Sequence, residues 1–244
     1  MRGYSARGCM CCRRTKSRRT SASILSGRWG KHPAMRACCL RMEVKSDAPQ
    51  QQKTTHGDAM TETPEMPQVY TRRLLLRPFT EQDFPAFMGY HSLPETYRYL
   101  FKVQPDPQAI RERFERALNP QAEHDGDEIR WAVIKHPEGI LTGEVMIRLT
   151  CKASRQAEIG CIFAPSFHRQ GIASEALTAL IGVAFKRYDL HRLFASIDIR
   201  NTGSYTLFSK LGWKQEGCLI ENMWVNGEWT SRYIYAMLAR NWQT

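Results

Sequence analysis

The stretch that decides the fold is Glu158-Ile-Gly-Cys-Ile-Phe-Ala-Pro-Ser-Phe-His-Arg-Gln-Gly-Ile-Ala-Ser-Glu-Ala-Leu177. Its apolar beginning predicts a β-strand that ends at Pro165, and a short basic turn with glycine at position 171 follows. Beyond the turn, apolar residues recur at helical spacing as far as Tyr188. A strand that leads through such a turn into a helix gathers free backbone N–H groups at the positive end of the helix dipole. The stretch therefore predicts a phosphate-binding turn, and we expect it to hold the pyrophosphate of a nucleotide-like cofactor.

Strand and helix patterns around this stretch are typical of a mixed α/β sheet. In the segment 143–150, Val145, Ile147 and Leu149 alternate with residues of another kind, which predicts a strand with one buried face. The expected strands are 72–77, 130–135, 143–150, 157–163, 192–199, 214–220 and 231–238, and the expected helices are 81–90, 110–118, 172–188 and 204–211. The helix at 172–188 is expected to be a crossover, and such connections between parallel strands are right-handed.

Four segments of the chain resemble one known family. The turn His168-Arg-Gln-Gly-Ile-Ala173 is similar to the Gln/Arg-x-x-Gly-x-Gly/Ala motif of the GNAT acyl-CoA N-acetyltransferases. Three further parts of the chain resemble the branch of this family that includes RimJ and RimL. They are Asn201-Thr-Gly-Ser204 with Lys210-Leu-Gly-Trp213, the opening 71–83 and the ending 216–238. The resemblance covers about residues 69–242. It implies an α/β (α+β) fold with a mixed, mostly antiparallel sheet, splayed central parallel strands and flanking helices.

The resemblance also implies an acetyl-CoA-dependent N-acetyltransferase, which moves an acetyl group to a primary amine by direct attack in a ternary complex. The pantetheine arm is expected to pair with the main chain of Ile162 and Phe163. Further cofactor contacts are expected from His168, Arg169, Gln170, Gly171, Ile172, Ala173, Asn201 and Ser204. The alternative interpretation, which needs no resemblance, is that the turn is an ordinary connection with solvated polar side chains and that Asn201 and Ser204 cap a helix.

Two residues are candidates for proton transfer. The resemblance implies that Ser204 is the acid for the departing thiolate, since Phe208 stands where many relatives use a tyrosine and cannot donate a proton. Glu158 is the candidate base, and the alternative is a salt-bridged strand glutamate. Met223 and Ser231 replace acidic residues of relatives, which weakens any transfer of their substrate and base. The histidines show no paired ligand spacing, so no metal is expected.

The acceptor is expected between residues 81–120 and the hairpin 220–231, which are rich in aromatic side chains. These rings could clamp a peptide N-terminus, or they could be core residues and cross-strand pairs. The leading prediction is a protein N-terminal α-amine as acceptor. The alternatives are a small-molecule amine, such as a polyamine, amino acid or antibiotic, and a non-catalytic acyl-CoA-binding module. A monomer and a homodimer are both compatible with the sequence.

Charge divides the chain into a leader at 1–68 and an acetyltransferase domain at 69–244. Residues 1–42 hold eleven Lys and Arg residues and no acid, so they account for the whole net charge of +11. The remainder balances 24 basic against 24 acidic residues. The leader is predicted to be disordered. It is interpreted as an over-extended start ahead of Met60 or Met66, as an organelle transit segment, or as a basic arm that contacts nucleic acid.

Cysteine usage indicates a reducing compartment. Only Cys151, Cys161 and Cys218 lie in the domain, each in or directly after an expected strand, and we expect them to be buried thiols. No run of 18 apolar residues occurs, so no membrane span is expected. The expected location is the cytoplasm, or an organelle if the leader is genuine.

Overall fold

An eight-stranded sheet runs through residues 66–242, the part of the chain that this computed structural model describes. Neighbouring strands follow the order β1-β2-β3-β4-β5-β6-β8-β7, and all adjacent pairs are antiparallel except β5 and β6. The strands are β1 (Val69–Tyr70), β2 (Leu74–Arg77), β3 (Glu128–Lys135), β4 (Ile140–Cys151), β5 (Gln156–Phe163), β6 (Arg192–Asp198), β7 (Lys214–Val225) and β8 (Glu228–Leu238). The predictions for the leader fall almost entirely outside the described residues.

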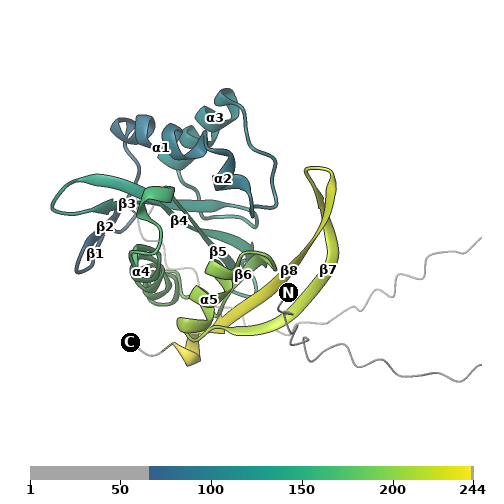
Figure 1. Cartoon of the computed structure of the whole chain (residues 1–244). Helices are drawn as coiled ribbons and strands as arrows, with labels where there is room; N and C mark the ends of the chain where they lie inside the picture. Colours follow the sequence, from purple (N-terminus) through teal and green to yellow (C-terminus); the bar gives the residue numbers. More distant parts are fainter. Residues whose placement is uncertain (1–65, 243–244) are drawn as a thin grey trace, which may run out of the picture. The chain divides into compact units, whose positions relative to one another are not determined.

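Helices cover both faces of the sheet (Figure 1). One side carries α1 (Phe84–His91), α2 (Pro94–Tyr97) and α3 (Pro107–Leu118), and the other carries α4 (Ile172–Lys186) and α5 (Thr202–Lys210). Short 3-10 turns complete the chain at η1 (Glu81–Asp83), η2 (Pro165–Phe167) and η3 (Ala239–Asn241). This arrangement confirms the mixed, mostly antiparallel sheet with flanking helices that the sequence predicts. No helix among the described residues is long and apolar enough to cross a membrane.

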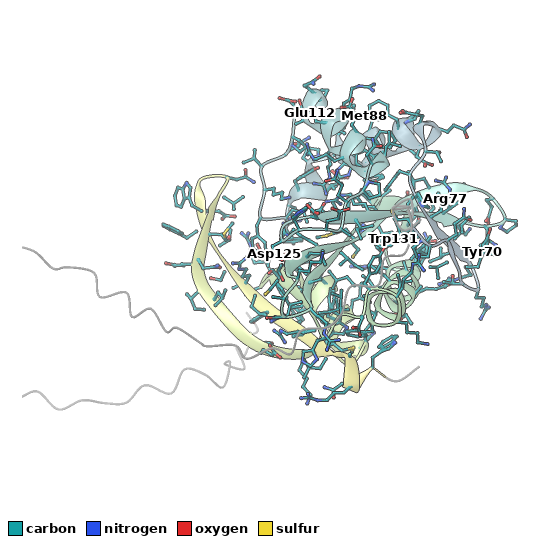
Figure 2. All side chains as sticks on the ribbon, turned by 180° about the vertical axis from the view of Figure 1, so that it is seen from behind. Tyr70, Arg77, Met88, Glu112, Asp125 and Trp131 are labelled. Carbon is teal, nitrogen blue, oxygen red and sulfur yellow. The ribbon has the colours of Figure 1, made fainter. Side chains whose placement is uncertain are left out.

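The alternation predicted for β4 is what attaches α4 to the sheet. Val145, Ile147 and Leu149 are buried, and they share one core with Leu177 and Leu180 of α4. Full burial of such a side chain contributes about 1.5–3 kcal/mol, so these contacts fix the helix firmly on this face. Figure 2 shows the labelled Trp131 inside the molecule, whereas Tyr70 and Glu112 lie at its periphery.

A second, smaller core attaches α1 and α3 to the opposite face. Its members from α3 are Ile110, Phe114 and Ala117, one helical turn apart along the buried stripe. The helix begins where the sequence predicts a cap, because the Asp106 side chain accepts a 2.8 Å hydrogen bond from the N–H of Ala109. Pro107 occupies the first turn, where its missing N–H costs nothing.

The closing hairpin is longer than predicted. β7 and β8 continue to the turn at Asn226 and Gly227, which adopt φ angles of 51° and 81°. Two consecutive positive φ angles match the twist of a tight hairpin. Most of β7 is exposed, so its far half has no alternating pattern that the sequence could reveal. The expectation of buried thiols is wrong for Cys218, which is exposed on this strand, while Cys151 and Cys161 are half-buried.

The two parallel strands part soon after they meet. Only three residue pairs join β5 to β6, from Gln156 opposite Arg192 to Glu158 opposite Phe194. Beyond Glu158, β5 continues for five residues along β4 alone, while β6 continues along β8. The splayed central strands are therefore present, with α4 as the crossover between them.

Candidate active site

A cavity of about 320 Å³ occupies the gap between the splayed strands. Its walls come from both strands, from β3 and β4, from α3, from the start of α5, from the segment that follows α2 and from the β7–β8 hairpin. The residues from β5, β6 and α5 are Glu158, Ile159, Gly160, Cys161, Ile162, Ala195, Ser196, Ile197, Asp198, Asn201, Ser204 and Phe208. The cavity thus brings together Glu158, Ile162, Asn201 and Ser204, four of the residues that the sequence singles out. Phe163 and the turn at 168–173 do not line it; they lie where β5 ends.

The main chain of β5 presents alternate residues to this gap. The N–H of Ala164 donates to the carbonyl of Thr142 at 2.9 Å, and Ile162 is the register partner of Glu144. In an antiparallel ladder, every second residue directs its N–H and C=O to the same neighbour. Since Ala164 bonds to β4, the N–H and C=O of Ile162 also point toward β4, and those of Cys161 and Phe163 point away from it. The ladder geometry therefore offers Cys161, rather than Ile162, as the second main-chain partner beside Phe163. Ile162 contributes its side chain to the wall.

The turn after β5 has the conformation that its glycine predicts. Gly171 is the N-terminal flanking residue of α4 and has φ 77° and ψ 0°, a left-handed conformation that L residues rarely adopt. The turn is held from within, because His168 Nε2 donates to the carbonyl of Phe163 at 2.9 Å and Gln170 Nε2 donates to the carbonyl of Ser166 at 2.8 Å. Arg169 is exposed with φ 60°, which leaves its guanidinium free to meet an anion.

A contact from the start of the domain braces the same turn. Arg73 donates through Nη1 to the carbonyl of Gln170 at 3.0 Å, and its Nε pairs with Glu175 at 2.7 Å. Glu175 also accepts from the hydroxyl of Thr71 at 2.6 Å. The sequence analysis missed Arg73, and no local pattern could have revealed it because its partners lie about a hundred positions away.

Asn201 and Ser204 play different parts at the start of α5. The Asn201 side chain accepts from the N–H of Ser204 at 3.1 Å, so Asn201 is the helix cap. The Ser204 hydroxyl makes no hydrogen bond within the described part of the chain, and it faces the cavity. Phe208, one turn further along the helix, is buried edge-on against Trp213 and is a core residue as well as part of the wall.

Glu158 lies in the cavity wall as an ion-paired carboxylate. Its Oε2 accepts from Arg148 of the neighbouring strand, and the residue is almost fully buried. This is the geometry of the salt-bridged alternative, although the side chain still borders the cavity. Glu221, on the exposed hairpin, does not line this cavity; its N–H is bound by the Ser231 hydroxyl at 2.8 Å. Ser231 thus binds the main chain of β7 at the place where the β7–β8 register shifts, between Leu219 and Met223.

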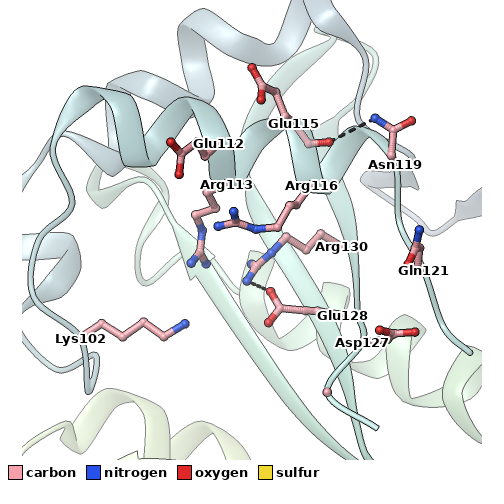
Figure 3. A pocket seen from close by; sticks show the side chains of 11 residues that line it. Lys102, Glu112, Arg113, Glu115, Arg116, Asn119, Gln121, Asp127, Glu128 and Arg130 are labelled. Atoms are coloured by element: carbon pink, nitrogen blue, oxygen red, sulfur yellow. Dashed lines mark hydrogen bonds and ion pairs between the residues drawn. The ribbon is translucent and has the colours of Figure 1, made fainter. Parts of the chain in front are cut away.

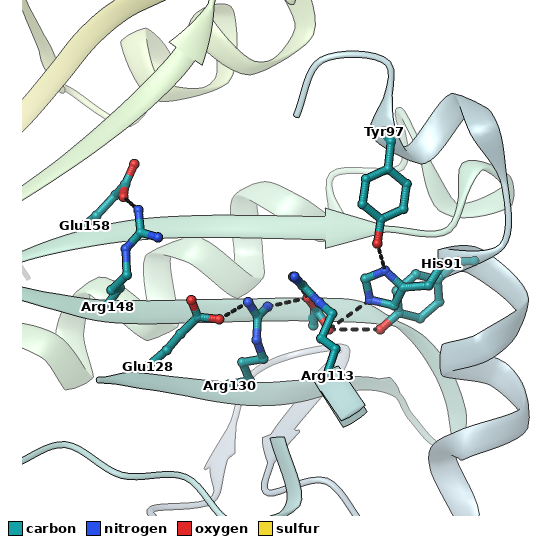
Figure 4. A network of polar contacts seen from close by, with 9 residues as sticks. His91, Tyr97, Arg113, Glu128, Arg130, Arg148 and Glu158 are labelled. Carbon is teal, nitrogen blue, oxygen red and sulfur yellow. Dashed lines mark hydrogen bonds and ion pairs between the residues drawn. The ribbon is translucent and has the colours of Figure 1, made fainter. Parts of the chain in front are cut away.

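A second buried carboxylate, Glu144 of β4, was not foreseen from the sequence. It belongs to the network of polar contacts in which Figure 4 labels His91, Arg113 and Arg130. It is fully buried, yet each of its oxygens accepts two hydrogen bonds. One oxygen meets Arg113 and Arg130, and the other meets the hydroxyl of Tyr90 and Nε2 of His91. A buried charge persists only when it is paired in this way.

The protonation states in this network follow from its geometry. Burial alone would raise the pKa of Glu144, but the guanidinium groups of Arg130 and Arg113 hold the pKa well below its usual value. Burial lowers the pKa of His91, so the imidazole is neutral. Because a carboxylate can only accept, Nε2 of His91 carries the proton, and Nδ1 accepts from the hydroxyl of Tyr97 at 2.6 Å. Glu144 is therefore an organiser of the wall and is too acidic to serve as a base near neutral pH.

A larger, open hollow of about 760 Å³ adjoins the cavity between α3 and β3 (Figure 3). The two spaces share Lys102, Arg113, Glu128 and Arg130. In Figure 3 the Lys102 side chain reaches into this hollow toward the arginines. Burial, reinforced by Arg113, Arg130 and Arg148, lowers the pKa of Lys102 to about 8.

The aromatic residues on the acceptor side divide between core and wall. Tyr90, His91 and Tyr97 are buried in the polar network, whereas Tyr99 and Phe101 line the cavity. Trp224 and Trp229 form an edge-on pair on the exposed hairpin, with ring centroids 5.2 Å apart. They are thus a cross-strand pair outside the cavity.

Comparison with known proteins agrees with this geometry. Residues 73–214 match the family model described as the acetyltransferase (GNAT) domain. The uncharacterized N-acetyltransferase YnaD of Bacillus subtilis (strain 168) is 30% identical over 175 residues, which cover 71% of this chain and 98% of that protein.

Two solved structures extend the comparison. The crystal structure of a GNAT-family acetyltransferase from Bacillus anthracis has a TM-score of 0.64 at 28% identity and covers 71% of this chain and 99% of that one. The Vibrio cholerae spermidine N-acetyltransferase in complex with CoA and spermine has a TM-score of 0.62 at 21% identity, covers 70% of this chain and 98% of that one, and shares the fold. With residues 73–214 matched and a relative aligned over nearly its whole length, this chain belongs to the GNAT family of N-acetyltransferases.

Proposed function

We propose that this chain transfers an acetyl group from acetyl-CoA to the α-amine at a protein N-terminus. The observation that carries the proposal is the gap between β5 and β6, where β5 has no strand partner on this edge beyond Glu158 and Ser204 lines the cavity. An extended pantetheine arm fits such a gap, because amide groups along the arm can pair with the main chain of Cys161 and Phe163 as a strand would. Membership of the GNAT family supports the same co-substrate.

The remaining cofactor contacts follow from the ends of this gap. The pyrophosphate would lie on the N–H groups of Gly171, Ile172 and Ala173 at the start of α4, where the helix dipole favours an anion. Arg169 would add a charge-assisted contact from the exposed side of the turn. His168 and Gln170 would keep the turn in shape through the carbonyls that they already bind.

Acetyl-CoA supplies a thioester, whose carbonyl carbon an amine can attack while the carbon–sulfur bond breaks. Ser204 is the proposed donor to the departing thiolate, because its hydroxyl faces the cavity and is not used elsewhere in the described chain. An α-amine has a pKa of about 8 and is partly deprotonated at neutral pH, so it needs little help from a base. Glu158 is the proposed acceptor of the amine proton through water. Its pairing with Arg148 stabilises the carboxylate and so makes it a weaker base.

The acceptor would enter from the side of Tyr99, Phe101 and Met223, which line the cavity together with Ser204. These residues come from the segment after α2 and from β7 of the closing hairpin. The N-terminus of a polypeptide would lie between these two elements. A small-molecule amine is the second candidate, and the spermine in the Vibrio cholerae structure is the observation in its favour.

The test is to measure acetyl-CoA binding by calorimetry and then CoA thiol release with a panel of N-terminal peptides and small amines. The proposal predicts saturable binding and thiol release that depends on a peptide with a free α-amine, and N-acetylation of the peptide blocks release. Release with small amines alone would favour the second candidate. Binding without release for any amine would make the chain an acyl-CoA-binding module.

A further inference from the structure

The cavity between β5 and β6 is lined by nearly equal numbers of basic and acidic residues, but its acids are all paired while two of its cations are not. Five basic and four acidic residues line it, and every acid is already engaged by a guanidinium group. Glu128 pairs with Arg130, and Glu158 pairs with Arg148. No carboxylate in this wall is therefore left to receive a cation from a substrate.

The two most buried of these acids are each held by guanidinium groups. Both oxygens of Glu144 are saturated by the four donors described above. Asp198 is 2% exposed, and its oxygens accept from the N–H, Nε and Nη2 of Arg200 at 2.7–2.9 Å. Freeing Glu144 for a substrate ammonium would leave the buried Arg113 and Arg130 without this carboxylate, which is strongly unfavourable. Freeing Asp198 would break its pairing with Arg200.

Two cations in the same wall are left without a carboxylate. Among the described residues, Lys102 forms no ion pair. Its charged neighbours are three guanidinium groups and the carboxylate of Glu158, which is itself paired with Arg148.

Arg232 forms no ion pair among the described residues. It lies opposite Asp198 in the β6–β8 ladder, but that carboxylate is paired with Arg200. The Arg232 guanidinium lies 5.6 Å from the ring centroid of Phe101, and the Asn222 amide oxygen, when turned toward it, accepts from Nε and Nη2 at 3.0 Å. One cation comes from the segment after α2 and the other from β8, so they approach the cavity from two different elements.

We infer that the acceptor of this enzyme carries an anionic group close to its amine, and that Lys102 and Arg232 bind this group. The inference rests on the proposed function, and it narrows the acceptor to amines that bear a nearby carboxylate. Such a carboxylate can come from an acidic side chain at the first or second position of a peptide, or from the α-carboxyl group of a free amino acid. The depressed pKa of Lys102 agrees with the inference, because burial and then the nearby guanidinium groups disfavour its charged form, and an incoming anion would offset both effects.

A polyamine fits the same wall poorly. It would bring further positive charges next to Lys102 and Arg232 and would find no free carboxylate in the cavity. The outer hollow holds four acids and four basic residues, and two of these acids, Glu112 and Glu115, come from α3 and do not line the cavity. The charge of the acceptor therefore separates this chain from enzymes that select polycations.

The experiment compares acceptors that differ by one charge and little else, using the full chain with acetyl-CoA. One pair consists of peptides with aspartate or asparagine at the second position, a second pair is alanine and alaninamide, and spermidine is the third arm. We expect the anionic member of at least one pair to have a kcat/KM about tenfold or more above its neutral partner, as one charge-assisted contact provides. In Lys102→Met this ratio should fall toward one, whereas in Lys214→Met, which changes an exposed lysine at the start of β7, it should stay at the wild-type value.

The outcomes separate this inference from the proposed function. Peptides that are acetylated without regard to charge would overturn the inference and leave the function standing. Alanine preferred over alaninamide, with no peptide accepted, would support the inference and refute the peptide acceptor. Spermidine as the best acceptor would overturn both. If no acceptor turns over, the same pairs are titrated into the CoA-loaded protein by calorimetry, and equal affinity within each pair would overturn the inference.

Discussion

Replacing Glu144 with Gln should destabilise this protein more than any other single amide-for-acid exchange in the sheet. The side chain is fully buried, and its charge compensates Arg113 and Arg130, whose side chains are only 15% and 7% exposed. The amide would keep one acceptor but would leave two buried guanidinium groups with Glu128 as their remaining carboxylate. Breaking a buried ion pair in this way costs about 3–5 kcal/mol.

That cost should appear as a fall in Tm of roughly 6–20 °C, since 1 kcal/mol corresponds to about 2–4 °C in a domain of this size. Urea unfolding of the full chain provides the free energy, with Glu138→Gln as the matched control. Glu138 pairs with Lys135 on the exposed β3–β4 turn, so this control should behave like the wild type. A Glu144→Gln protein that loses less than about 1 kcal/mol would refute the compensation argument.

The stabilisation that Glu144 provides should also depend on pH, in a direction that its pKa determines. The folded-state pKa of Glu144 lies well below its ordinary value of 4.5, so its stabilising contribution is complete above that pH. As the pH falls below about 4.5, the unfolded chain binds a proton that the folded protein excludes, and the contribution is lost. The difference in unfolding free energy between wild type and Glu144→Gln should therefore narrow in acid and be constant near neutral pH.

Four further outcomes are expected. Gly171→Val should lose most acetyl-CoA affinity by calorimetry, because a β-branched residue cannot hold φ 77° without strain, and unchanged affinity in a folded variant would remove this turn from the site. Ser204→Ala should lower kcat by about 10²–10⁴-fold with little change in acetyl-CoA affinity if the hydroxyl serves the thiolate, whereas a loss under roughly tenfold would count against that role. The defect of Glu158→Gln should shrink as the pH rises and the acceptor amine deprotonates unaided; a defect that ignores pH would assign the residue to positioning. Labelling of Lys102 by an amine reagent should rise with a midpoint near pH 8, and Arg148→Met should move that midpoint upward by removing one repelling charge.

The strand, turn and helix from Glu158 to Lys186 were predictable because all their signals are local. Pro165 ends the strand, Gly171 supplies the left-handed residue, and the apolar stripe of α4 has an unbroken helical period. The Asp106 cap was predictable for the same reason. Local physics of this kind depends on neighbours within about four positions, which a single sequence displays directly.

The parts that escaped prediction depend on distant partners. In the sequence, Glu144 looks like an ordinary polar residue of a strand. Only the fold shows that its carboxylate meets Tyr90, His91, Arg113 and Arg130. Its neighbours come from α1, α3 and β3, so no periodicity in one segment could show them. The hairpin was a different case, because Asn226-Gly227 is a strong turn signal that could have extended both strands to their observed length.

With the co-substrate bound as proposed, the short junction between β5 and β6 would make the pantetheine arm a structural element of the sheet. Three residue pairs are all that join the half-sheet β1–β5 to the half-sheet β6–β8 along this seam. A pantetheine arm in the gap would act as a ninth, non-peptide strand and tie the two halves together, so loading should slow amide hydrogen exchange on both sides of the seam at once. Opening of that seam would then govern how fast the product CoA leaves, which couples turnover to the mechanical stiffness of the sheet.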